Sequence, residues 1–239
     1  MTIRVSDREA SERFYDTVLA TVGLEKAHSG EHFAEWVDFS LAQATQDRPI
    51  TRRLHIAFRA PSRAEVDEFW RVGTEAGYRD DGPPGERPQY SSDYYGAFLL
   101  DPDGNSAEAV IHDEPRAGPI DHLWLRVADL GSATTFYEAI APFSGFELVS
   151  ERPDRVSFQG ANGSFSLVRG EPTEHVHLAF PAHDDAVVEA FHEVAVRTGH
   201  RDNDPPGERP EYHAGYYAAF VLDPDGNNIE VVNHHRGDG

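Results

Sequence analysis

Short segments in which apolar and polar residues alternate recur along the chain, and several of them are followed by a helix-like segment. Because successive side chains of a strand point to opposite faces, residues 121–127 predict a strand in which the aliphatic residues Leu123, Leu125 and Val127 share one face. The even-numbered positions, His122, Trp124 and Arg126, share the other face. The aliphatic face should pack under a helix, which leaves the face of His122 open.

The same alternation predicts strands over residues 175–180 and 228–232. In these strands His177 and Glu230 lie opposite the aliphatic residues. Two imidazoles and one carboxylate on open sheet faces form the ligand set that suits Fe(II), Mn(II) or another divalent ion with free coordination positions. We therefore interpret His122, His177 and Glu230 as a candidate metal site.

Start and stop signals delimit the helix-like segments. Ser6-x-x-Glu9 and Ser62-x-x-Glu65 have the capping-box pattern. Helix C-caps are predicted at four glycines: Gly23, Gly77, Gly145 and Gly199. The DPDGN segments carry hairpin-turn residues between later strands. Together these signals predict an α+β fold of four βαβββ units, numbered 1 to 4 in chain order, at about 1–50, 53–113, 119–170 and 174–234.

The chain is a tandem duplication. When residues 54–110 are placed on residues 176–232, 30 of the 57 positions are identical without a gap. Chance does not produce such a match, so the chain consists of two related halves. We expect an N-terminal domain of residues 1–113 and a C-terminal domain of residues 114–239, with Asp113–Pro119 as the linker.

Charge and composition narrow the choice of partners. The net charge of -21 argues against nucleic acid and anionic membranes, which attract basic surfaces. No apolar stretch is long enough to span a membrane, and no cysteine is present to form disulfides or thiolate metal sites. The expected partner is a small-molecule substrate, and the expected location is cytoplasmic. A monomer and a homodimer both remain open.

The HxxF-type strands, the Phe-Tyr pair on a helix and the closing DPDGNxxE hairpin resemble the vicinal oxygen chelate superfamily. This superfamily includes glyoxalase I, type I extradiol dioxygenases and bleomycin-binding proteins. The resemblance implies that two βαβββ units form a cup around one divalent ion, here Fe, Mn, Zn, Ni or Co. It implies the same ligands as the alternation does, because the first strands of both units and the last strand of the second supply them.

By this resemblance the N-terminal half has a degenerate site. His55 and Glu108 match His177 and Glu230, but the position matching His122 would precede Met1. Ser91 also stands where the second half has His213. We therefore expect one ion, bound in the C-terminal domain. Two ligands can still hold a metal weakly, so a weak site at His55 and Glu108 stays open.

Further site residues follow from their places near the expected cup. His213, Tyr216 and Tyr217 are the candidates for proton transfer. Alternation places Tyr216 on the cup face and Tyr217 towards the helix, although a bulge would exchange them. The candidates for substrate contact are Trp124, Arg126, Phe220 and Arg209.

Three functions remain open at this stage. A metal-dependent dioxygenase is favoured slightly over glyoxalase-like isomerase or lyase chemistry, because Ser164–Leu167 lacks the second glutamate that glyoxalase I usually supplies from this strand. Phe220 weakens that preference, since extradiol enzymes carry a tyrosine there. The alternative is a protein that binds a drug or natural product without catalysis, as bleomycin resistance proteins do.

Overall fold

The computed structural model describes residues 1–113 and 117–235, so the expected linker lies partly outside the described residues. Unit 1 comprises β1 (Thr2–Val5), α1 (Arg8–Leu19), the 3-10 helix η1 (Ala20–Val22), β2 (His28–Ser29), β3 (Phe33–Trp36) and β4 (Phe39–Gln43). Unit 2 comprises β5 (His55–Arg59), α2 (Arg63–Glu75), β6 (Arg79–Glu86), β7 (Tyr95–Leu100) and β8 (Ser106–Ile111).

Unit 3 comprises β9 (Ile120–Val127), α3 (Leu130–Ser144), β10 (Phe146–Glu151), β11 (Arg155–Gly160) and β12 (Ser164–Arg169). Unit 4 comprises β13 (His177–Pro181), α4 (Asp185–Arg197), β14 (Arg201–Glu208), β15 (Tyr217–Leu222) and β16 (Asn228–Asn233). The four βαβββ units and the α+β class are therefore confirmed. None of the described helices is long and apolar enough to cross a membrane.

The strands form two eight-stranded mixed sheets, and each sheet draws on both halves of the chain. Sheet I has the order β10-β11-β12-β9-β5-β8-β7-β6 and joins units 3 and 2. Sheet II has the order β14-β15-β16-β13-β1-β4-β3-β2 and joins units 4 and 1. The expected halves, 1–113 and 114–239, therefore do not each build a sheet of their own.

The pairing of strands across the two halves has a simple physical cause. The first strand of each unit lies at one edge of that unit's own strands, where its backbone N–H and C=O groups need a partner. The first strands satisfy one another in antiparallel pairs, β5 with β9 and β1 with β13. The alternation of residues along a strand defines its two faces, but it does not define the neighbouring strand with which it pairs. The sequence alone therefore did not predict these pairings.

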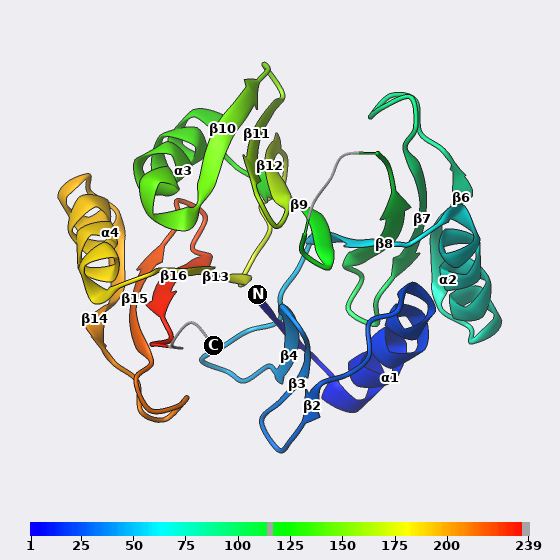
Figure 1. Cartoon of the computed structure of the whole chain (residues 1–239), viewed down its shortest axis with the longest axis horizontal. Coiled ribbons are helices and arrows are strands. Elements are labelled where there is room, and N and C mark those ends of the chain that lie inside the picture. The colour runs from blue at the N-terminus through cyan, green and yellow to red at the C-terminus, as the bar shows by residue number, and fades with distance from the viewer. Residues whose placement is uncertain (114–116, 236–239) are drawn as a thin grey trace.

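The helices, in contrast, pair within each half. Helix α1 packs on α2, and α3 packs on α4. Figure 1 shows the two helix pairs at opposite ends of the molecule, with the sheets running between them. The Phe-Tyr pairs expected on the helices are fully or almost fully buried in the core, as Phe14 and Tyr15 on α1 and as Phe136 and Tyr137 on α3.

The same tyrosines fix each helix to a loop of the neighbouring unit. Tyr15 donates a hydrogen bond of 3.1 Å to buried Asp101, and Tyr137 donates one of 3.0 Å to buried Asp223. Both aspartates begin a DPDGN turn. Each half is thus held together by its helices and by one buried hydroxyl–carboxylate contact, while the sheets join the halves.

Most of the helix-end signals operate as expected. The four predicted C-cap glycines have φ between 71° and 90°, the left-handed region where glycine is favoured. Ser62 caps α2, but α1 is capped by Asp7 rather than Ser6, because the Asp7 carboxylate accepts from the Ala10 N–H. Aspartate is as good an N-cap residue as serine, so the helix begins one residue later than predicted.

Candidate metal centre

One cluster of potential metal ligands is built around the middle of β5. Ala57 pairs with Glu108 on β8 at one side and with His122 on β9 at the other. His55 precedes Ala57 by two residues, so its side chain lies on the same face. Three neighbouring strands of sheet I therefore bring two imidazoles and a carboxylate together over one small alanine.

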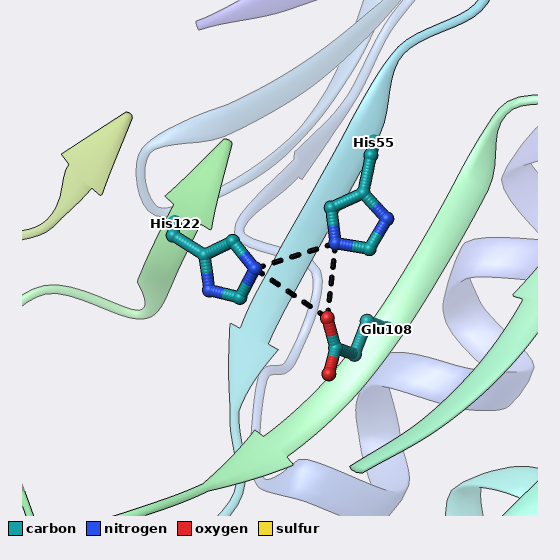
Figure 2. Close-up of side chains that lie close together, drawn as sticks. All are labelled: His55, Glu108 and His122. Atoms are coloured by element: carbon teal, nitrogen blue, oxygen red, sulfur yellow. Dashed lines mark hydrogen bonds and ion pairs between the residues drawn. The ribbon is translucent and has the colours of Figure 1, made fainter. Parts of the chain in front are cut away.

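The three donor atoms converge (Figure 2). His55 Nε2 lies 2.9 Å from Glu108 Oε2 and 3.3 Å from His122 Nε2, and His122 Nε2 lies 3.5 Å from Glu108 Oε2. Neighbouring ligands of one ion at about 2 Å have separations of this size, roughly 3 to 3.5 Å. Within residues 1–113 and 117–235, no other three His, Asp or Glu side chains converge in this way. The donor set therefore fits a divalent ion.

Each donor is oriented from behind. Asp121 Oδ1 lies 2.9 Å from His122 Nδ1, and Ser106 Oγ lies 3.2 Å from His55 Nδ1, so both Nε2 atoms are left to face the centre. Tyr94 donates a 2.6 Å hydrogen bond to Glu108 Oε1, the carboxylate oxygen away from the histidines. Partners of this kind fix ring orientation and increase metal affinity.

The surroundings of Tyr94 and Asp121 determine the protonation state of each side chain. Burial raises the pKa of Tyr94, and the neighbouring Glu108 carboxylate raises it further, so the phenol stays protonated and acts as a donor. Burial alone would raise the pKa of Asp121. Hydrogen bonds from His112 and His122 outweigh that effect and hold this pKa well below its usual range. Asp121 is therefore a permanent anion behind His122.

The cluster opens into a pocket of about 450 Å³, which we call pocket I. Its walls include two of the predicted substrate contacts, Trp124 and Arg126, together with Tyr90, Phe98 and Arg87. The Trp124 ring lies 5.2 Å from the His55 ring, centre to centre. Pocket I therefore combines an aromatic wall with cationic groups beside the candidate ligands.

The matching place on sheet II holds His177 and Glu230. His177 Nε2 lies 2.7 Å from Glu230 Oε2, and Tyr216 donates to Glu230 Oε1 at 2.5 Å. On the β1 side, His177 pairs with Thr2. The described residues supply no second histidine that converges with His177 and Glu230 here. The pocket above this pair, pocket II, also includes Arg209 and Phe220.

The structure therefore corrects the expected grouping of His122 with His177 and Glu230. His122 lies on β9 in sheet I, whereas His177 and Glu230 lie on β13 and β16 in sheet II. The site with three ligands uses His55 and Glu108 from the half that was expected to be degenerate. The cause is the exchange of edge partners, since β9 meets β5 rather than β13.

The three predicted proton-transfer residues lie in unit 4 and not beside the three-ligand cluster. His213 lies away from the three-ligand cluster. Its Nε2 lies 3.1 Å from Nδ1 of His234, the residue that follows β16 of sheet II. Tyr216 contacts Glu230. Tyr217 points to the helix side, where it donates to Glu189 of α4. The sequence reasoning missed Tyr94 and Asp121. The repeat could have revealed Tyr94, because it matches Tyr216, while nothing in the alternation singles out Asp121.

The comparison with protein families agrees with this geometry. The model of the Glyoxalase/Bleomycin resistance protein/Dioxygenase superfamily matches residues 1–109 and again residues 119–231. The chain belongs to this superfamily. The two matches correspond to the two halves of the duplication. No curated protein sequence gave a significant match.

Among solved structures, glyoxalase I from Zea mays is similar over the whole chain. Its TM-score is 0.70 at 20% identity, covering 98% of this chain and 90% of the maize protein. The V278E mutant of the maize enzyme gives 0.72 at 19% identity, with the same coverage. A candidate dioxygenase from Bacillus subtilis gives 0.66 at 15% identity, covering 99% of this chain and 84% of the other. At 15–20% identity, the likeness to these structures shows that this chain shares their fold.

Proposed function

We propose that this superfamily member is a divalent-metal-dependent enzyme that acts on a small molecule with two adjacent oxygens. The observation that carries the proposal is the convergence of His55, Glu108 and His122 on one point beside pocket I. Three protein ligands leave coordination positions free for the two substrate oxygens. A bound ion would supply Lewis-acid polarisation or a site for dioxygen activation.

The chain's own residues would bind and orient the substrate. Trp124 and Phe98 offer aromatic faces, and Arg126 offers a positive charge on the strand that carries His122. Tyr94 would hold the Glu108 carboxylate in place through its hydroxyl. Asp121 would keep His122 in the tautomer whose Nε2 faces the centre.

Dioxygenase-like chemistry is favoured over isomerase or lyase chemistry by the residue at the fourth ligand position. In sheet I, Ser166 on β12 pairs with Trp124 and stands where glyoxalase I usually has a glutamate. Its hydroxyl lies 2.9 Å from that of Ser157. A three-ligand set is the one typical of iron oxygenases.

Metal analysis combined with oxygen uptake tests the proposal. The protein is purified without added metal or chelator, its metals are measured, and dioxygen consumption is followed with a panel of catechols and with α-oxo aldehyde–thiol adducts. Iron with oxygen uptake is expected. Zinc, nickel or cobalt with turnover but without oxygen uptake would favour the isomerase or lyase class. A protein that binds a test compound and releases it unchanged would contradict catalysis.

Glu108→Gln and Glu230→Gln form a matched pair for the same experiment. The two glutamates occupy equivalent positions of the repeat, and each accepts from a tyrosine hydroxyl. The first variant should lose turnover, and the second should keep it. Equal losses in both would overturn the assignment of the active site to sheet I.

A further inference from the structure

Pocket II is lined by charged side chains of both signs. It has a volume of about 410 Å³ and includes three arginines, Arg4 on β1, Arg48 on the loop after β4, and Arg209. Three carboxylates, Asp47, Asp204 and Glu211, line the same pocket. Arg4 and Arg48 are the side chains that could bind an anion in this pocket.

Two of the three guanidinium groups have no ion-pair partner among the described residues. Arg209 is engaged, since its Nη2 lies 3.0 Å from Asp204 Oδ2 and donates to the Pro205 carbonyl at 2.8 Å. Among the described residues, the side chains of Arg4 and Arg48 make no hydrogen bond and no ion pair. Burial lowers the pKa of Arg4, and the nearby Arg48 guanidinium lowers it further. The two cations repel each other, and an anion between them would relieve that repulsion.

The acidic side chains of the pocket leave these two arginines available. Asp204 is taken by Arg209. Asp47 and Glu211 are exposed, and neither forms an ion pair within the described residues. Glu230 is buried and occupied by His177 and Tyr216.

Arg48 belongs to a segment that the other half lacks. In both halves a threonine hydroxyl accepts from the backbone N–H of the strand arginine, Thr51 from Arg4 and Thr173 from Arg126. Between the preceding strand and that threonine lie residues 44–50 in unit 1, but only residues 170–172 in unit 3. The longer loop of unit 1 thus adds Arg48 to the lining of pocket II, whereas residues 170–172 of unit 3 add no side chain to the lining of pocket I.

We propose that pocket II is a binding site for a small organic anion, a carboxylate- or phosphate-bearing molecule, held by the guanidinium groups of Arg4 and Arg48. Guanidinium groups match the geometry of both kinds of anion through paired N–H donors. The positive charge that a metal supplies in the proposed active site would come from arginine in pocket II. The site does not depend on the proposed enzymatic activity.

Calorimetric titration of the full-length protein with inorganic phosphate and, separately, with succinate tests the proposal at low ionic strength. Saturable binding of at least one probe is expected, weakened by added salt. Arg4→Gln and Arg48→Gln should each reduce the affinity by about 10- to 100-fold, the value of one charge-assisted contact. The probe that binds identifies the anion class.

Two controls separate this site from pocket I. Arg126→Gln removes the arginine that matches Arg4 in pocket I, and Glu108→Gln disables the candidate metal site. Both should leave the anion affinity unchanged. Arg48→Gln alters an exposed loop residue, so it should fold normally, which its thermal unfolding checks. Absence of saturable binding with both probes, or binding that Arg4→Gln and Arg48→Gln leave intact, would overturn the proposal.

Discussion

His122 Nε2 lies 3.3 Å from His55 Nε2, although the two residues are 67 positions apart and come from different halves of the duplication. The contact exists because β9 pairs with β5 across the halves. The candidate metal centre is therefore a property of the whole chain, since each half alone lacks part of the ligand set.

Tyr94→Phe should weaken metal binding without removing it. The hydroxyl holds Glu108 Oε1 at 2.6 Å, and loss of such a supporting contact typically costs about 10- to 100-fold in metal affinity. Competition with a chelating dye measures this affinity. Tyr216→Phe removes the equivalent hydroxyl beside Glu230 and should leave the affinity as in the wild type. If both substitutions act equally, Tyr94 has no special role.

Gly96→Ala should disturb the same carboxylate oxygen. A methyl group at this position would overlap Glu108 Oε1, so the carboxylate must shift. The second half has Ala218 at the matching position. We expect Gly96→Ala to lower metal affinity by about tenfold or more, and Ala218→Gly to have no effect on it. Unchanged affinity in Gly96→Ala would show that Glu108 is not constrained as described.

Much of this fold could be predicted from the sequence, because periodicity and turn chemistry are local. Alternation placed His122, His177 and Glu230 on open sheet faces, and the helix-end and turn signals predicted the four units. The neighbour of each first strand could not be predicted, since all four units expose the same kind of edge. The ligand set was therefore assembled from the wrong units, and His213 was expected beside a ligand cluster from which it lies apart.

Tyr137→Phe should destabilise the fold in a pH-dependent way. Burial raises the pKa of Asp223 above 3.8, and the hydrogen bonds from Asn227 and Tyr137 only partly offset this. Without the hydroxyl, the folded-state pKa rises further, so the ionised carboxylate costs more free energy in the folded protein. The penalty should reach about 1–3 kcal/mol at pH 7 and shrink as the pH falls towards 3.8.

Urea unfolding at pH 7 and pH 5 measures this difference. Tyr15→Phe, which loses the equivalent bond to Asp101, should behave in the same way. Tyr78→Phe serves as the control, because the Tyr78 hydroxyl makes no hydrogen bond within the described residues. If the loss of unfolding free energy in Tyr137→Phe does not change with pH, the ionisation of Asp223 is not its cause.

The metal content of His122→Ala and His177→Ala, each purified beside the wild type without added metal, tests most directly whether the metal centre lies in sheet I. These histidines occupy equivalent faces of the two sheets, but only His122 converges with His55 and Glu108. We predict one divalent ion per wild-type chain, loss of the ion in His122→Ala and its retention in His177→Ala. Loss of the ion in His177→Ala, with its retention in a Glu108→Ala variant, would contradict a metal centre in sheet I and restore the grouping expected from the sequence.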